Sequence, residues 1–199
     1  QKVGGGNMLA ALSEAAFITG MERNSDLVKM ASYAPLFENR NDRTWPVNLI
    51  WIDNMQVVGH SSYYVQKVMA ENKPTYNLKT VIIPRVVSIS EPKAGNSFAD
   101  SPRQFSVGGY DETTGEIIVK VVNAEEKPWR SSIKINNCGK IFPGGEVITL
   151  SADSLPAENS FEEPMKISPV KSEYNIFSNA FNYEFKPCSL TVLRIRTEK

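Results

Sequence analysis

The sequence contains only one histidine, His60, and two cysteines, Cys138 and Cys188. This set is too small for a transition-metal site built from imidazole and thiolate ligands, and two distant cysteines do not make a disulfide framework. No nucleophile motif accompanies His60, so a relay that depends on histidine is not indicated. We predict that His60 is solvent-exposed or begins a helix, that each cysteine is a small buried or half-buried strand residue, and that the protein uses no metal and no cofactor.

The chain also lacks a charge excess and a long apolar run. Lysine plus arginine and aspartate plus glutamate number 22 each, so the formal net charge is zero, and neither nucleic acid nor a membrane is an expected partner. No apolar stretch is long enough to span a bilayer. The sequence opens with Gln1 rather than methionine, from which we infer a processed or cut protein. Extracellular, periplasmic and cytoplasmic locations therefore all stay open.

Residues 7–37 carry the strongest helical pattern. Asn7 can cap a helix whose apolar side chains recur at helical spacing, and Gly20 is a natural stop. These apolar side chains form one wide face: Met8, Leu9, Leu12, Ala15, Ala16 and Phe17. Asn24 or Ser25 can then cap a second helix that ends near Ala31. We interpret both segments as packed helices of an α/β architecture.

A short apolar run at residues 49–52 follows a polar loop at residues 38–44, and it predicts a strand buried on both faces. Residues 61–72 predict a third helix, capped by Ser61 or Ser62. Helix, buried strand and helix form the repeating unit of an α/β barrel, yet a single parallel strand cannot satisfy its own backbone groups. We therefore expect its neighbours to be missing from this chain or supplied from elsewhere, as in a truncated (β/α)8 barrel.

Helical spacing disappears after residue 75. Short β-rich runs take its place, at residues 81–89, 104–107, 116–123, 131–135, 147–150, 181–185 and 190–195. Residues 111–115 and 142–145 predict tight turns, and residues 151–171 predict a long surface connection. We predict a mainly β fold, in which a helix-strand-helix remnant of a (β/α)8 barrel over residues 1–75 precedes an antiparallel, jelly-roll-like β-sandwich over residues 76–199.

Three stretches carry a resemblance: LAALSEAAFITGMERNSDLVKMASYAPLF from residue 9, LIWIDN at 49–54 and SSYYVQKVMAEN at 61–72. Together with residues 185–195, they resemble the α-L-arabinofuranosidases of glycoside hydrolase family 51. The resemblance implies an enzyme that removes terminal arabinofuranose from arabinose-containing polysaccharides or oligosaccharides with retention, through a glycosyl-enzyme intermediate. It also implies that both catalytic glutamates lie upstream, so we expect no catalytic residue in this chain and no activity from it alone.

Four residues near the predicted strand are candidates for substrate binding: Trp45, Asn48, Asp53 and Asn54. Asp53 and Asn54 follow the strand, and ligand-binding groups of barrels lie at that end of the strands. The alternative is that they cap the next turn. Trp45 can stack on a sugar ring or pack against the barrel. Around Asn48 this chain reads WPVNLI at 45–50, whereas members of the family often read Trp-Asn-Pro-Asp-Leu-Ile.

Three functions remain open: the C-terminal part of such an enzyme, a stand-alone carbohydrate-binding β-sandwich, or a structural brace for the barrel. A binding module requires an exposed row of aromatic side chains, for which Tyr110, Trp129 and Tyr174 are the candidates. A truncated barrel would expose helix faces and a strand edge. We therefore expect either a homo-oligomer or helices that fold onto the sandwich.

Overall fold

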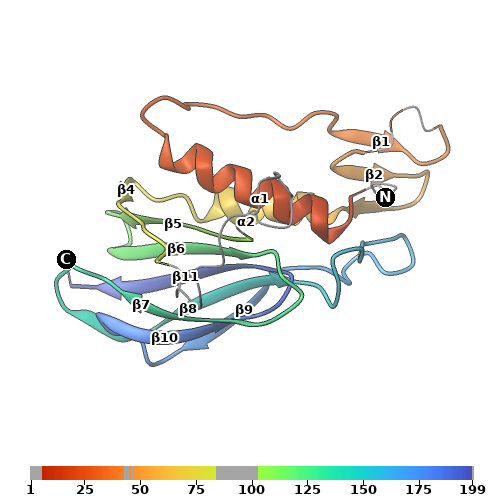
Figure 1. Ribbon diagram of the computed structural model, residues 1–199. Coiled ribbons are helices and arrows are strands. Elements are labelled where there is room, and N and C mark those ends of the chain that lie inside the picture. The colour runs from red at the N-terminus through yellow and green to blue at the C-terminus, as the bar shows by residue number, and fades with distance from the viewer. Residues whose placement is uncertain (1–5, 43–44, 46, 84–102, 199) are drawn as a thin grey trace, which may run out of the picture.

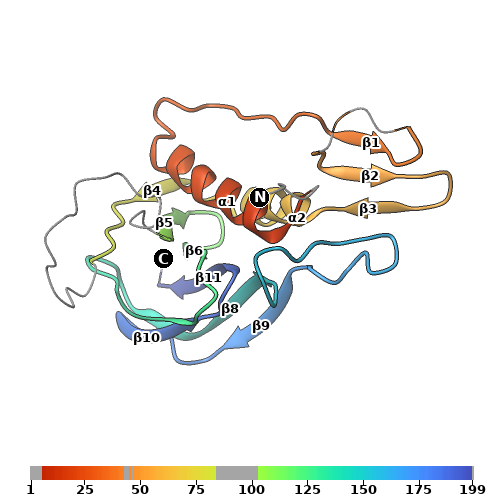
Figure 2. The ribbon, with the colours of Figure 1, turned by 45° about the vertical axis from the view of Figure 1, so that its right-hand side comes forward.

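The computed structural model describes residues 6–42, 45, 47–83 and 103–198, and it arranges them in layers (Figure 1). Helices α1 (Met8–Arg23) and α2 (Ser61–Glu71) form the first layer. They lie on a large antiparallel sheet, whose other face is covered by a pair of strands, β7 (Trp129–Lys134) and β10 (Ala180–Phe185). A small third sheet projects beyond the helices at one end, as Figure 2 shows.

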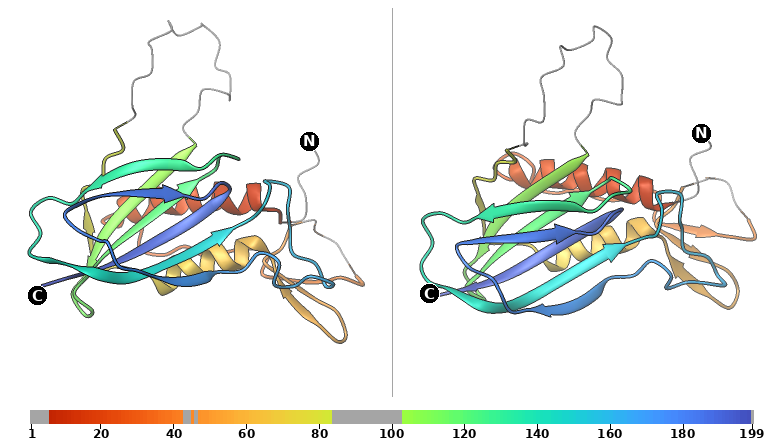
Figure 3. Two further views of the ribbon diagram at one scale, coloured as in Figure 1. Left: turned by 90° about the horizontal axis from the view of Figure 1, so that it is seen from below. Right: turned by 60° about the horizontal axis from the view of Figure 1, so that its bottom comes forward.

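The large sheet has the strand order β4-β5-β6-β11-β8-β9, and its described pairings are antiparallel. Its strands are β4 (Tyr76–Leu78), β5 (Gln104–Asp111), β6 (Glu116–Asn123), β8 (Ile141–Ser151), β9 (Val170–Tyr174) and β11 (Ser189–Thr197). Side chains alternate between the two faces of each strand. On β11, Leu190 and Val192 face the helices, whereas Leu193 and Ile195 face the β7–β10 pair. The sheet therefore has an apolar core on each side, and Figure 3 views these layers from below.

Helix α1 begins where the sequence predicts. Oδ1 of Asn7 accepts a hydrogen bond of 3.1 Å from a first-turn N–H, as a helix cap does. The N–H of Met8 donates to the carbonyl of Ala157 at 2.8 Å. The N–H of Leu9 donates to the carbonyl of Leu155 at the same distance. The loop between β8 and β9 therefore satisfies the two N–H groups that the Asn7 side chain does not reach.

The end of α1 departs from the prediction. Gly20 does not stop the helix, which continues to Arg23, and residues 24–27 form a turn instead of a second helix. The chain then runs back along α1 toward the small sheet (Figure 1). We call residues 24–36 the return segment. Phe17 of the predicted apolar face is 71% exposed, because the large sheet covers α1 from one side only.

The small sheet consists of β1 (Phe37–Asn39), β2 (Ile50–Ile52) and β3 (Val57–Gly59). Strand β2 coincides with the predicted strand, but its neighbours come from this chain: β1 pairs with it in parallel and β3 in antiparallel orientation. The expectation that these neighbours are missing is wrong. Strands of three residues are too short to show an alternating pattern, and β1 overlaps the stretch that resembles a polar loop.

The strands predicted between residues 104 and 195 are confirmed, as is the turn at 111–115 that joins β5 to β6. The predicted turn at 142–145 is wrong, because these residues lie inside β8. Strands β4 and β9 have no counterpart among the predicted strands. Of the first predicted β run, residues 81–83 are not a strand, and residues 84–89 lie outside the described residues.

The connection between β8 and β9 has neither helix nor strand over residues 152–169, yet it buries Asn159 and Ile167 completely or nearly so. It is therefore part of the core and not only a surface link. Cys138 is half-buried and Cys188 is buried, as predicted, but both lie just outside strands. Neither α1 nor α2 has the length and apolarity that a membrane-spanning helix needs.

Candidate functional site

Asp53 and Asn54 stand in the turn between β2 and β3. Oδ1 of Asp53 accepts hydrogen bonds of 2.7 Å from the N–H groups of Met55 and Gln56. This carboxylate oxygen therefore closes the turn, which is the alternative to sugar binding that the sequence offers. The Asn54 side chain is exposed beside it.

Asn48 and Trp45 lie in the loop that leads into β2. Asn48 is 2% exposed, and its Nδ2 donates to Oε2 of Glu38 at 2.8 Å and to the carbonyl of Trp45 at 2.9 Å. The Asn48 amide is thus engaged inside the protein. The Trp45 side chain is 59% exposed, and an indole face of this kind suits stacking on a sugar ring. Sugar contact at Trp45, Asn48, Asp53 or Asn54 stays a prediction.

His60 occupies the N-cap position of α2, which confirms the helix-start alternative, but it is fully buried and not exposed. Its ring meets that of Trp51 edge-on, with the centroids 3.8 Å apart. The Arg40 guanidinium lies over the Trp51 ring at 4.1 Å from the centroid, and Phe161 stacks on it at 6.3 Å. These groups fill the space between β2, the start of α2 and the β8–β9 loop. His60 and Trp51 therefore join three parts of the chain by packing.

Ser61 and Ser62 do not cap α2, since both lie inside the helix. The Ser62 hydroxyl instead donates to Oε1 of Glu14 on α1 at 3.0 Å, and the Tyr33 hydroxyl donates to the same oxygen at 3.2 Å. Burial raises the pKa of Glu14, although these hydrogen bonds oppose the shift. Burial and the nearby charge of Glu14 raise the pKa of Tyr33 to about 12. This cluster ties the return segment to both helices.

Glycoside hydrolysis requires two carboxylates that flank the scissile bond. Glu14 lies between the two helices, and Glu38 lies in the small sheet. Glu22, in the last turn of α1, forms an ion pair with Lys120 of the large sheet. Each of these three carboxylates is thus held by a different partner within the protein. The described part of the chain also holds no group of three or more His, Cys, Asp or Glu side chains that could bind a metal ion.

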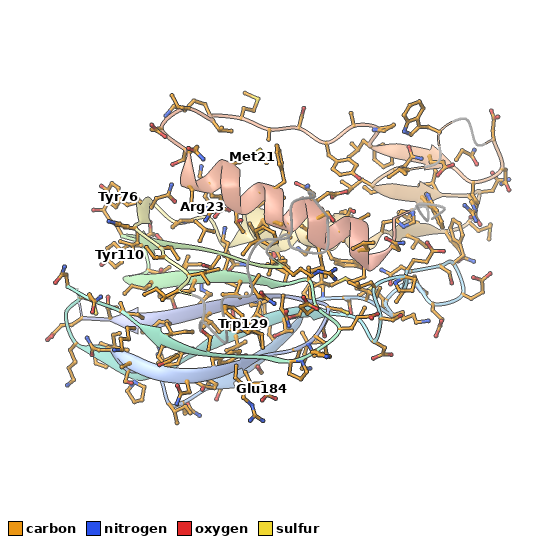
Figure 4. All side chains as sticks on the ribbon, viewed as in Figure 1. Met21, Arg23, Tyr76, Tyr110, Trp129 and Glu184 are labelled. Carbon is orange, nitrogen blue, oxygen red and sulfur yellow. The ribbon has the colours of Figure 1, made fainter. Side chains whose placement is uncertain are left out.

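The aromatic candidates for sugar binding do not form a surface row. Figure 4 shows Tyr110 at one end of the large sheet and Trp129 in the other layer, on β7. Trp129 stacks on the buried Phe185 with the centroids 5.3 Å apart, and Tyr174 packs on the buried Phe177 at 4.7 Å. All three candidates contact the apolar core under the β7–β10 pair. These three residues therefore do not supply, within the described part of the chain, the exposed row that a binding module requires.

Comparison with known proteins shows that the chain is similar to one part of longer proteins. The model of the α-L-arabinofuranosidase C-terminal domain family matches residues 4–189. α-L-Arabinofuranosidase 2 of Arabidopsis thaliana is 35% identical over 167 residues, which cover 84% of this chain and 23% of the relative. A probable α-L-arabinofuranosidase A of Aspergillus terreus is 30% identical over 190 residues, which cover 94% of this chain and 27% of the relative. The chain thus spans about a quarter of the length of these relatives.

Solved structures likewise match this chain over only a part of their own length. An arabinose-bound GH51 α-L-arabinofuranosidase superposes with a TM-score of 0.83 and 26% identity, over 96% of this chain and 28% of the other. The Thermotoga maritima α-L-arabinofuranosidase in complex with arabinose superposes with a TM-score of 0.72 and 17% identity, over 94% of this chain and 38% of the other. The second likeness concerns the fold alone. In both cases the similar region is a minor part of a longer protein.

Proposed function

Since the chain belongs to the family of α-L-arabinofuranosidase C-terminal domains, we propose that it is the C-terminal part of a retaining glycoside hydrolase that removes terminal arabinofuranose from arabinose-containing polysaccharides or oligosaccharides. The family match over residues 4–189 carries the proposal. In it, the acid/base and nucleophile glutamates belong to a part of the enzyme that this chain does not contain. The reaction requires no cofactor, and the balanced charge of 22 basic and 22 acidic residues suits a neutral glycan better than nucleic acid or a membrane.

In this proposal, residues 1–75 complete the catalytic barrel, and residues 76–199 are the sandwich that braces it. The return segment supports this division. Among the described residues, positions 29–34 make no backbone hydrogen bond, although the N–H and C=O groups of an ordered segment require partners. A parallel sheet would supply such partners on both sides of the segment. We therefore assign the barrel strand to residues 28–36 and not to residues 49–52.

Exposed apolar side chains of the return segment and of α1 give further support. Leu27 and Met30 of the return segment are 77% and 88% exposed, and Phe17 on α1 is 71% exposed. Upstream residues of the barrel would cover them. We also propose that the full enzyme is a homo-oligomer, because β4 lies at the edge of the described sheet and leaves Tyr76 54% exposed.

Activity assays test the assignment. The purified chain of 199 residues should release no nitrophenol from a nitrophenyl α-L-arabinofuranoside, whereas a longer enzyme that contains this sequence as its C-terminal part should release it steadily. Turnover by the chain alone would overturn the placement of the catalytic residues. Hydrolysis of other glycosides but not of arabinofuranosides by the longer enzyme would overturn the substrate class.

Deletion of residues 76–199 from the longer enzyme tests the bracing role. The deletion should lower the midpoint of thermal unfolding and change the oligomeric state measured by light scattering. An enzyme that keeps both properties after the deletion would refute the bracing role and leave the assignment of activity untouched.

A further inference from the structure

Lys120 is a charged side chain enclosed by the protein. It lies on β6, on the face of the large sheet that carries the helices, and it is 1% exposed. Its Nζ forms an ion pair with Oε1 of Glu22 and donates to the carbonyl of Met69 at 3.1 Å. Burial lowers the pKa of Lys120, although the charge of Glu22 opposes the shift. A buried ammonium group without such partners is strongly destabilising, so both contacts matter for this site.

The two partners of Lys120 belong to the ends of both helices. Glu22 lies in the last turn of α1, and Met69 lies in the last turn of α2, where carbonyl groups have no partner within the helix. One ammonium group on the sheet therefore holds both helices, at ends where a positive charge is favourable. The other carboxylate oxygen of Glu22, Oε2, is buried without a hydrogen-bond partner among the described residues. Lys120 is thus the group that compensates the Glu22 charge.

A second contact holds the turn that follows α1. Asn77 on β4 donates through Nδ2 to the carbonyl of Glu22 and to Oγ of Ser25, the latter at 2.7 Å. Figure 4 shows Arg23 at this end of α1, near Tyr76 at the edge of the sheet. The return segment starts at this turn. Its direction as it leaves α1 therefore depends on how Glu22 and Ser25 are held.

We propose that Lys120 is a positioning residue, whose ion pair with Glu22 fixes the start of the return segment at the end of α1. The inference rests on the proposed function for the role of that segment as a barrel strand, but the contact lies wholly within this chain. Apolar side chains could also hold α1 on the sheet, since replacing a buried ion pair by apolar residues is often neutral for stability. The ion pair also fixes the orientation of the end of α1, because the Glu22 carboxylate must reach the Nζ of Lys120 on the sheet.

Hydrogen exchange of the 199-residue chain tests the proposal with Lys120→Met, which removes the charge and keeps an extended side chain. The hydrogen-bonded N–H groups of the turn are those of Asn24, Ser25, Leu27 and Val28. In the variant they should exchange at least about tenfold faster, and by a larger factor than the central amides of β6 and β11, whose rates follow the global stability. Lys67→Met is the matched control, because Lys67 pairs with Glu71 on the solvent side of α2 and should change neither set.

A double variant separates positioning from packing. Lys120→Met together with Glu22→Leu leaves no unpaired buried charge, so its midpoint of urea unfolding should return toward that of the parent chain while the turn still exchanges fast. Wild-type protection of the turn in the double variant would overturn the proposal. Equal acceleration of turn and sheet in Lys120→Met would also overturn it, since that is the effect of lost global stability, and so would unchanged exchange. None of these outcomes depends on catalysis, so failure here leaves the proposed function standing.

Discussion

Residues 103–198 and residues 24–59 differ in how completely the chain satisfies them. In residues 103–198, long strands pair with neighbours, and side chains such as Leu190 and Leu193 are fully buried. In residues 24–59, each strand has three residues, positions 29–34 make no backbone hydrogen bond to described residues, and Met30 and Met55 are 88% and 89% exposed. The first region has a closely packed core, whereas the second has exposed apolar side chains and backbone groups without hydrogen bonds to described residues. Mutations should therefore cost much in the first region and little in the second.

The largest effect is expected at Leu190, in the core between the large sheet and the helices. Leu190→Ala should lower the free energy of unfolding by about 2–5 kcal/mol, because it leaves a cavity in a closely packed site. Urea denaturation of the 199-residue chain measures this change. Met30→Ala, at an exposed position of residues 24–59, should change the same quantity by less than about 0.5 kcal/mol. Equal losses in the two variants would remove the contrast between the regions.

An intermediate effect is expected at Asn159, which joins the two regions. Its Nδ2 donates to the carbonyl of Gly59 at 3.0 Å and to that of Ile167 at 2.9 Å, and its Oδ1 accepts from the N–H of Ile167 at 2.7 Å. Asn159→Ala should cost about 1–3 kcal/mol, because it leaves these buried groups without partners. Thermal unfolding should show the loss, and hydrogen exchange should locate it in β3 and the β8–β9 loop. Glu158→Ala, at an exposed neighbour, is the control, and a similar loss there would point to backbone disturbance.

The smallest effect is expected at Tyr33, and it depends on pH. The pKa of Tyr33 is about 12 in the folded chain, above its ordinary value of 10.0, because of burial first and the Glu14 charge second. The folded chain thus keeps a proton that the unfolded chain loses. The stabilising contribution is complete below about pH 10 and is lost as the pH rises toward 12. Tyr33→Phe should remove this loss, so the stability difference between wild type and variant should shrink over that range in urea titrations. A constant difference would refute the coupling.

Local signals explain which elements the sequence predicts. Asn7 caps α1 through its own side chain, and the turn at 111–115 includes Gly115 with a φ of 71°, a conformation that glycine adopts easily. The predicted second helix has a real N-terminal signal, since the N–H groups of Leu27 and Val28 both bond to the carbonyl of Asn24. It does not continue, because so short a helix needs an apolar face packed on the protein. The absence of such packing cannot be seen in the sequence.

The glycines at 144–145 show how tertiary structure overrides a turn signal. A Cβ on Gly145 would lie 2.3 Å from the carbonyl oxygen of Arg194, so glycine is needed there for the close approach of β11 and not for a turn. Close to this point, the register of β8 and β11 shifts between Ile195 and Thr197. Proline and glycine in sequence do not distinguish a turn from such an irregular strand.

The contacts of the candidate site residues also fall into those that the sequence predicts and those that it does not. The turn role of Asp53 could be predicted because its partners are two and three residues away. The pairing of Asn48 with Glu38 could not, because these residues meet only after β1 and β2 have paired. The burial and ion pair of Lys120 are harder still to predict, since its ionic partner Glu22 lies 98 positions away. A lysine within a strand usually indicates a solvent-facing position.

The central place of β11 has a consequence for the nascent chain. On the ribosome, β6 and β8 are complete long before Thr197, yet the strand that joins them is still missing. At about 5–20 residues per second, synthesis of residues 152–197 takes about two to nine seconds. During that interval the edges of β6 and β8 that pair with β11 have no partner strand. We expect chaperones to protect the nascent chain during this interval, and slow codons in this stretch to lower the yield of correctly folded protein.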